Sequence, residues 1–278
     1  MTRSSSRRWK SCPPNKVLFD AHNHLQAKRF AGRQAELLAE CEGLSRMVVN
    51  GCAEEDWPQV AALAKAHPQV LPSFGYHPWF IHERTGNWES ELNRFLDAHP
   101  ASVGEIGLDR WKEGLEYEGQ EEVFTAQLHI AAERNLPVSI HCLKAWGRLL
   151  ELLEQGPVTA RGFLLHSYGG SAEMIALLAK LGAYFSFPGY YIREAQGRQR
   201  EAFTQVPPDR LLIETDAPDQ LLPEELREHA LDDPEGNPIN HPANLGAVYR
   251  FVAKMLDEPL EKLEARVEEN FLRLFGGL

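Results

Sequence analysis

Six side chains that can bind a divalent cation lie in short apolar segments spread along the sequence. They are His22 and His24 in FDAHNHL, Glu105 in VGEIGLD, His141 in PVSIHC, His166 in FLLHSY and Asp216 in LLIETDA. Imidazole nitrogens and carboxylate oxygens bind Zn²⁺, Mn²⁺ and similar ions, and a carboxylate can serve two ions at once. Four imidazoles and two carboxylates therefore predict a site for two ions, with at least one carboxylate close to both.

His22 and His24 form an alternating pair. In a strand every second side chain faces the same way, so Asp20, His22 and His24 share one face. Two imidazoles on one face can reach one ion, but the 11 histidines of the chain give roughly 0.4 such pairs by chance. Taken alone, the pair equally indicates an ordinary surface or core pair, and the other four residues decide the interpretation.

The six residues need a fold that brings distant segments together. Eight apolar segments predict buried parallel strands, at 17–25, 46–52, 70–77, 102–109, 137–142, 162–168, 183–189 and 210–217. Helical patterns lie between and after them, at 87–98, 117–135, 171–181, 243–256 and 261–275. This alternation predicts an α/β fold, a (β/α)8 TIM barrel. A doubly wound sheet is the alternative, although it would rarely use eight units without a second domain.

Such a barrel explains where the metal-binding side chains stand. Each lies at or near the C-terminal end of an expected strand, and in barrel enzymes these ends converge on one pocket. A buried His, Glu or Asp must be satisfied, and a shared cation satisfies several of them at once. The stretch 219–242 breaks the alternation, and we expect it to be a long loop over the mouth of the barrel.

Length and composition agree with this architecture. The chain has 278 residues with a net charge of −11, and 43% hydrophobic and 25% charged residues are ordinary globular values. The acidic balance argues against a protein that coats nucleic acid or membranes through bulk charge, but it allows an enzyme whose site holds its own cations. We expect one barrel domain over residues 17–278, after a basic arm over residues 1–16 that lacks the apolar stretch of a signal peptide.

The cysteines and the hydropathy suggest the cellular setting. The four cysteines form no CxxC pair and no zinc-finger spacing, which favours reduced thiols in a cytoplasmic protein. We expect no cysteine nucleophile, since none of the four has the local histidine partner that would activate a thiol. No apolar run approaches the length needed to span a bilayer.

The ordered motifs resemble one family. FDAHNHL, GYHPW, VGEIGLD, PVSIHC, LLHSYGG, SFPG, LLIETDAP, PANL and ENFLRLFG are together similar to the TatD family of metal-dependent hydrolases, from about residue 17 to residue 275. The resemblance implies a (β/α)8 barrel hydrolase with one or two divalent metals, of a group usually described as deoxyribonucleases.

The resemblance also implies roles for individual residues. It puts His22, His24 and Asp216 around one ion and His141 and His166 around the other, with Glu105 close to both. Asp216 and Glu105 are then the expected catalytic residues, with Asp216 orienting or deprotonating a metal-bound water. His77 in GYHP resembles a family histidine that faces the site and can contact the substrate phosphate.

The sequence departs from the family pattern at two places that bear on the substrate. The family's HxR arginine, which suits a bidentate phosphate grip, is replaced by Leu143, and the adjacent Lys144 is the substitute cation that we expect to bind substrate. Asp219 and Gln220 follow Pro218, and His241 stands where glutamate is common. An added acid near the mouth would repel a long polyanion.

Three functions remain open from the sequence. The first is metal-dependent hydrolysis of phosphodiester bonds in DNA, as a deoxyribonuclease acting from 3′ ends, with Zn²⁺, Mn²⁺ or Mg²⁺ in the site. The second keeps the site but acts on a small phosphoester, lactone or amide. The third is a non-enzymatic binding protein, which the complete set of ligands disfavours. We expect DNA ends or a small phosphoester as the partner, and no membrane or obligate protein partner.

Overall fold

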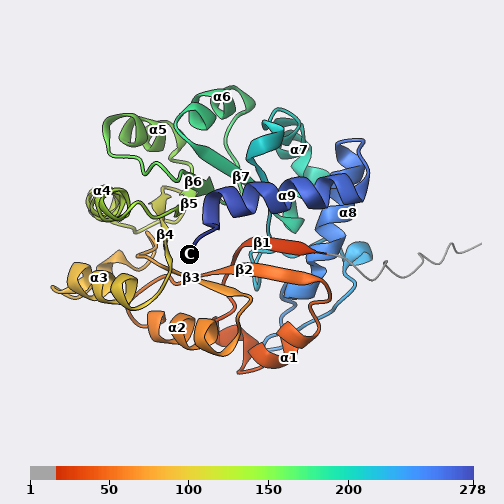
Figure 1. Cartoon of the computed structure of the whole chain (residues 1–278), viewed down its shortest axis with the longest axis horizontal. Coiled ribbons are helices and arrows are strands. Elements are labelled where there is room, and N and C mark those ends of the chain that lie inside the picture. The colour runs from red at the N-terminus through yellow and green to blue at the C-terminus, as the bar shows by residue number, and fades with distance from the viewer. Residues whose placement is uncertain (1–16) are drawn as a thin grey trace, which may run out of the picture.

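The computed structural model describes residues 17–278, so the predicted arm over residues 1–16 lies outside the described residues. Eight parallel strands form one sheet in the order β1 to β8, each paired with its neighbours in sequence. They are β1 (Leu18–Asn23), β2 (Leu44–Asn50), β3 (Val70–Phe74), β4 (Ser102–Asp109), β5 (Val138–Leu143), β6 (Phe163–Leu165), β7 (Ala183–Phe187) and β8 (Leu211–Ile213). The predicted barrel is confirmed (Figure 1).

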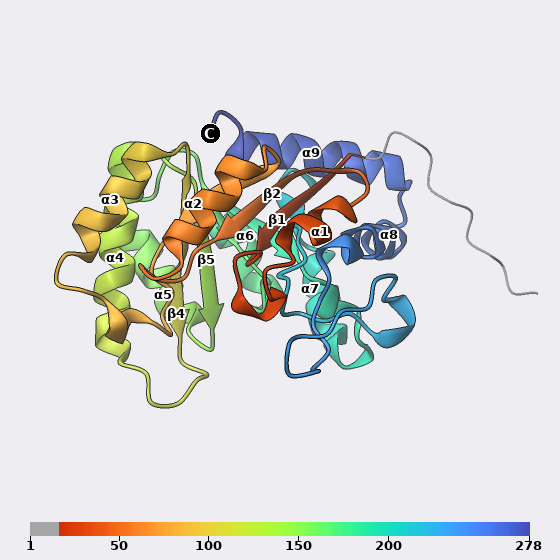
Figure 2. The ribbon, with the colours of Figure 1, turned by 90° about the horizontal axis from the view of Figure 1, so that it is seen from below.

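Helices surround the strands. They are α1 (Gln34–Ala39), α2 (Trp57–Ala66), α3 (Trp88–Ala98), α4 (Tyr117–Arg134), α5 (Trp146–Gln155), α6 (Ala172–Lys180), α7 (Gly197–Phe203), α8 (Leu245–Met255) and α9 (Leu260–Phe275). Figure 2 shows α9 lying across one end of the barrel. There the Phe271 ring packs 4.8 Å from the Phe19 ring, and Asn270 donates hydrogen bonds to the carbonyls of Pro208 and Leu211. Helix α9 therefore covers the end where the strands begin.

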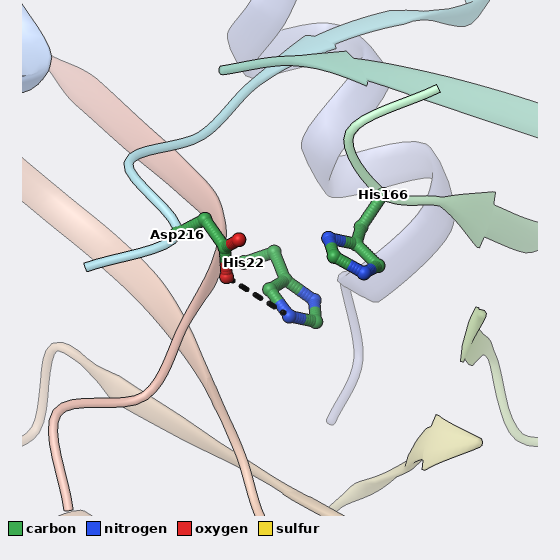
Figure 3. Close-up of side chains that lie close together, drawn as sticks. All are labelled: His22, His166 and Asp216. Carbon is green, nitrogen blue, oxygen red and sulfur yellow. Dashed lines mark ion pairs between the residues drawn. The ribbon is translucent and has the colours of Figure 1, made fainter. Parts of the chain in front are cut away.

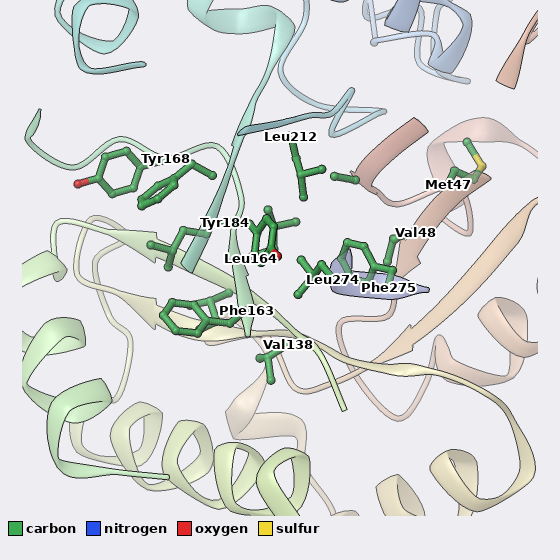
Figure 4. Packing of buried hydrophobic residues seen from close by; sticks show 14 of the residues in the cluster. Met47, Val48, Val138, Phe163, Leu164, Tyr168, Tyr184, Leu212, Leu274 and Phe275 are labelled. Atoms are coloured by element: carbon green, nitrogen blue, oxygen red, sulfur yellow. The ribbon is translucent and has the colours of Figure 1, made fainter. Parts of the chain in front are cut away.

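The strands are apolar because helices and barrel interior bury both of their faces. All eight residues of β4 and all five residues of β3 and of β7 are buried. Figure 4 shows how side chains from separate strands, among them Val48, Val138, Leu164 and Leu212, fill the core together with Leu274 of α9. Burial on both faces explains why these segments read as continuous apolar runs rather than as alternating ones.

The first and last strands meet at their carboxyl ends. The His24 N–H donates to the Ala217 carbonyl at 2.8 Å, and the Asp216 N–H donates to the His22 carbonyl at 2.9 Å. The Tyr249 hydroxyl of α8 bonds to both backbone groups of Phe19 in β1. These bonds hold β1 beside β8 and so bring the two ends of the sequence to one edge of the barrel.

Several strands are shorter than predicted. Strand β6 ends at Leu165 and β8 at Ile213, whereas the apolar runs predicted 162–168 and 210–217. Beyond these residues the backbone is no longer part of the paired strands, and the polar side chains that follow lie at the mouth of the barrel. The predicted loop 219–242 contains the short 3₁₀ turn Glu224–Leu226 and an isolated bridge between Asp232 and Pro238, and it ends where the 3₁₀ turn Pro242–Asn244 begins.

Candidate metal centre

The six predicted ligands come from the carboxyl half of the barrel. His22, Glu105 and His141 lie within β1, β4 and β5, and His24, His166 and Asp216 lie one to three residues beyond β1, β6 and β8. All are buried except His24, whose side chain is 14% exposed. Their potential ligand atoms fall into three overlapping groups, and the third also includes His77. These are His22, His24 and Glu105; His22, His166 and Asp216; and His77, Glu105 and His141.

The first donor group surrounds one point. It consists of His22 Nε2, His24 Nε2, Glu105 Oε2 and Asp216 Oδ1. The two nitrogens lie 3.3 Å apart, 3.4 and 3.2 Å from the Glu105 oxygen, and 3.6 and 3.5 Å from the Asp216 oxygen. Four ligands bonded at about 2.1 Å in a tetrahedron lie about 3.4 Å from one another. These spacings therefore fit one zinc-sized ion.

The second donor group uses the other oxygen of the same carboxylate. Glu105 Oε1 lies 3.3 Å from His141 Nδ1 and 2.8 Å from His166 Nε2, and these two nitrogens lie 3.2 Å apart. The groups adjoin, since the His22 and His166 rings stack with centroids 4.0 Å apart (Figure 3). The two oxygens of Glu105 thus lie beside different pairs of imidazole nitrogens.

Hydrogen bonds behind the histidines leave the inward nitrogens free. His24 Nδ1 lies 2.8 Å from the Asn50 carbonyl, an acceptor only, so in the neutral ring Nδ1 carries the proton and Nε2 has the lone pair that a metal needs. In His141 the roles reverse, because Nε2 faces Asp109 Oδ2 at 3.1 Å and Nδ1 points inward. His22 Nδ1 lies 2.8 Å from the Ser139 hydroxyl. Such outer partners orient metal-binding imidazoles.

The electrostatics of the cluster favour a cation. Burial lowers the pKa of His22 to about 3, so this imidazole is neutral, the form that binds metal. Burial raises the pKa of Asp216 to about 8. Burial alone would also raise the pKa of Glu105, but the surrounding imidazoles outweigh it and hold this pKa well below its usual range. A divalent ion would supply the positive charge that these buried carboxylates attract.

His77 is placed as a hydrogen-bond donor. Its Nδ1 accepts from the Trp79 N–H at 3.2 Å, so in the neutral ring the proton is on Nε2, which lies 3.4 Å from Glu105 Oε1. Burial lowers the pKa of His77 to about 4, which keeps the ring neutral. The inward N–H suits a phosphate oxygen better than a metal ion.

The predicted substrate cation lies elsewhere. Lys144 is exposed and does not belong to the lining of the cavity over the cluster, whereas Leu143 does. That cavity holds about 410 Å³, and its lining includes Arg29, Asp219 and Gln220 from the loops after β1 and β8. Arg29 donates to Asp219 Oδ1 at 2.7 Å. The acid expected to repel a polyanion is therefore paired with an arginine.

Sequence reasoning missed Glu214. This fully buried carboxylate accepts hydrogen bonds from the backbone N–H and hydroxyl of Ser167 and from the hydroxyl of Ser186, and its Oε1 lies 3.8 Å from His166 Nδ1. That nitrogen has no other partner. The signal was present in the sequence, because Glu214 stands two residues before Asp216 and would share its face in the strand expected over 210–217.

Two further side chains support the cluster or touch it. Asp20 accepts from the backbone N–H and the hydroxyl of Thr215 at 3.0 and 2.6 Å, which ties β1 to the segment after β8. Cys52 Sγ lies 3.6 Å from His24 Nδ1, a contact that the sequence did not reveal. Burial raises the pKa of this thiol to about 12, so it is not a nucleophile.

Comparisons with known proteins agree on one family. A family model described as TatD related DNase matches residues 19–276. The sequence is 31% identical to the 3′-5′ ssDNA/RNA exonuclease TatD of Escherichia coli (strain K12), over 93% of this chain and 99% of that protein. It is 29% identical to a metal-dependent hydrolase of Bacillus subtilis (strain 168), YabD, with the same coverage.

Solved structures share the fold. The TatD homologue YjjV of Escherichia coli K12 superposes with a TM-score of 0.84 at 25% identity, covering 94% of this chain and 98% of that one. A TatD family hydrolase from Entamoeba histolytica superposes with a TM-score of 0.81 at 17% identity, covering 94% and 99%. No helix within residues 17–278 is long and apolar enough to cross a membrane.

Proposed function

Because the chain belongs to the TatD family of metal-dependent hydrolases, we propose that it hydrolyses phosphodiester bonds at the 3′ ends of single-stranded DNA or RNA. The relative named as a 3′-5′ ssDNA/RNA exonuclease supports this substrate class. The observation that carries the proposal is the position of Glu105, whose two oxygens face two separate groups of metal-binding atoms. Paired ions are a common arrangement for cleaving phosphodiesters.

The proposed ligands are His22, His24 and Asp216 for one ion and His141 and His166 for the other, with Glu105 between them. Bound divalent ions lower the pKa of a coordinated water and polarise the phosphoryl oxygen. We propose Zn²⁺ or Mn²⁺ in preference to Mg²⁺, because imidazole is a softer ligand than the oxygen donors that Mg²⁺ prefers.

The side chains around the ligands have distinct tasks in this proposal. Asn50 and Asp109 hold the rings of His24 and His141 so that each presents a lone pair inward. Asp216 accepts the proton of the attacking water on a carboxylate oxygen. His77 donates its Nε2 proton to a non-bridging phosphate oxygen, where negative charge grows during attack.

The expected setting of this enzyme is the cytoplasm. Cys41, Cys52 and Cys142 are free thiols in the described part of the chain, which suits a reducing compartment. We propose few contacts with a long nucleic acid, because the chain carries a net charge of −11 and the cavity arginine is already paired with Asp219.

The test is hydrolysis of a 3′-labelled single-stranded oligonucleotide by protein loaded with Zn²⁺ or Mn²⁺, with a chelated sample beside it. Asp216→Asn should lower kcat by about 10²- to 10⁴-fold, the usual contribution of general acid–base catalysis. The matched control is Asp97→Asn, since Asp97 pairs with Arg134 on the outer helices. If metal-loaded protein leaves DNA and RNA intact but cleaves a small phosphoester, lactone or amide, the nuclease proposal is wrong and only the hydrolase assignment remains.

A further inference from the structure

One side of the catalytic cavity is aromatic. Trp79 and Phe80 follow β3 and Trp111 follows β4, and all three line the cavity that also contains Glu105 and His141. We call these three residues the aromatic wall. Trp111 is 57% exposed, the highest value among the exposed large hydrophobic residues of the described chain. Aromatic side chains that line a cavity together with a few convergent polar groups are typical of ligand-binding pockets.

The aromatic wall is fixed to the metal-binding cluster by one buried carboxylate. Asp109 Oδ2 accepts from Trp79 Nε1 at 2.6 Å, and Asp109 Oδ1 accepts from the Trp111 N–H at 2.7 Å. The same Oδ2 lies 3.1 Å from His141 Nε2, and the side chain of Asp109 is fully buried. One carboxylate therefore sets the positions of both tryptophans relative to a proposed metal ligand.

Within the aromatic wall, Trp111 is the tryptophan whose ring faces are not covered by a cation of the described chain. The Lys112 ammonium stands 4.3 Å from the centre of the Trp79 ring, a cation–π contact that covers one face of that ring. No such contact involves Trp111 in the described chain. The opposite rim differs in chemistry, since Arg29 and Asp219 form an ion pair there.

We propose that the aromatic wall is a nucleobase-stacking subsite. It holds the base of the nucleotide whose phosphate reaches the proposed metal ligands, with Trp111 as the stacking platform and Lys112 as a nearby cation for the backbone. Every base has a π-face, so stacking binds all four nucleotides with little preference for sequence. This inference rests on the proposed function for its ligand class, and it explains how a site with Leu143 in place of an arginine retains nucleotides.

A binding measurement tests the base alone. The probes are dAMP and 2-deoxyribose 5-phosphate, which carry the same phosphate with and without a base, titrated against the metal-loaded protein by calorimetry. We expect dAMP to bind about tenfold more tightly than the sugar phosphate, within the usual range for base–aromatic stacking. Trp111→Ala should abolish this difference and leave the affinity for the sugar phosphate unchanged, and Trp111→Phe should restore most of it.

Tyr117→Ala is the matched control. Tyr117 is an exposed aromatic residue at the start of α4, 40% exposed, and it does not line the cavity. This variant should bind both probes like the wild type. The proposal is overturned if wild type binds the two probes equally, or if Trp111→Ala weakens both to the same extent. The second result would point to a structural role or to a surface for another protein.

A second substrate pair separates this inference from the nuclease proposal. Oligonucleotides that end in a normal or an abasic 3′ nucleotide should differ about tenfold in KM for wild type and not at all for Trp111→Ala. Cleavage of both substrates with equal KM by wild type overturns the stacking subsite and leaves the nuclease proposal intact. Cleavage of neither overturns the nuclease proposal, while the dAMP titration still decides on the subsite.

Discussion

At the scale of single residues, the proposed site depends on which ring nitrogen of each histidine carries a proton. Asn50 accepts from His24 Nδ1, and the N–H of Trp79 occupies the lone pair of His77 Nδ1. His24 therefore turns the lone pair of its Nε2 toward Glu105, whereas His77 turns its Nε2–H toward the same carboxylate. Two imidazoles within 3.4 Å of the same carboxylate are therefore suited to different tasks, metal binding and donation to substrate.

The same tautomer argument weakens another group of residues that could hold a metal, which lies apart from the cluster around Glu105. Glu40, His229 and His241 lie together near the loop before α8. His241 Nδ1 accepts from the Ala243 N–H at 3.0 Å, so its Nε2, 3.5 Å from Glu40 Oε2, carries the proton. A protonated nitrogen cannot bind a cation, and the group is better described as a histidine that begins the turn Pro242–Asn244.

The Arg29–Asp219 pair leads to a prediction about substrate affinity. Asp219→Asn removes the closer of the two carboxylates beside the guanidinium, because Asp219 Oδ1 lies 2.7 Å and Asp233 Oδ2 3.8 Å from it, so Arg29 becomes more available to a phosphate of the substrate. We expect KM for a single-stranded oligonucleotide to fall about two- to tenfold, and the dependence of log KM on log salt to steepen by about 0.7, the value for one added phosphate contact on a single strand. Steady-state kinetics at several salt concentrations measures both.

Adding Arg29→Ala to Asp219→Asn should remove the gain. Asp97→Asn, which breaks a remote carboxylate–arginine pair with the same 2.7 Å contact, should leave KM unchanged. An unchanged or higher KM in Asp219→Asn would show that Arg29 does not contact the substrate.

At the scale of elements, the barrel unites ligands from five strands at one end. Strands β1, β4, β5, β6 and β8 supply them, and β1 meets β8 only when the barrel closes. Asp20 and Tyr249 stabilise that junction from two sides, through Thr215 and through the backbone of Phe19. The first donor group forms only when β1 meets β8, because His22 lies in the first strand, His24 directly after it and Asp216 in the segment after the last.

Tyr249→Phe tests the junction between β1 and α8. The change removes a hydroxyl that bonds to both the N–H and the carbonyl of Phe19, in a fully buried position. We expect the free energy of unfolding to fall by about 1–3 kcal/mol, because a buried polar group loses its partner. Urea unfolding followed by circular dichroism measures the change. Tyr117→Phe, at an exposed position, should change stability by less than about 0.5 kcal/mol, and equal effects of the two variants would contradict the role given to Tyr249.

At the scale of the whole molecule, metal binding and folding stability are linked. An ion that binds only the folded chain stabilises it by about 2.7 kcal/mol at a free concentration one hundred times its Kd. Chelation should therefore lower Tm by several degrees without loss of secondary structure, because the core away from the site is apolar and needs no metal. Differential scanning calorimetry with and without Zn²⁺ measures the shift. Glu105→Gln, which changes the bridging carboxylate, should shrink it, and a full shift in this variant would argue against bridging.

Sequence patterns predicted the class of fold well and the ends of its elements less well. Apolar runs located all eight strands because burial on both faces requires them. The predicted strands extend past the observed ends of β6 and β8, because the residues that follow are also buried. Those residues surround the cavity and are no longer part of the paired strands. Periodicity records burial, and it does not distinguish a strand from a buried loop.

For the candidate site too, the sequence determined one part and the tertiary structure another. Residue types and their order along the chain determined which six side chains would meet, because strand ends in a barrel converge whatever the loops do. Only the tertiary structure decided that Glu105 uses its two oxygens separately, that Cys52 touches His24, and that Leu143 rather than Lys144 lines the cavity. Only the folded chain pairs Arg29 with Asp219, 190 residues apart. Such contacts depend on distances and side-chain directions in space, which a linear pattern does not encode.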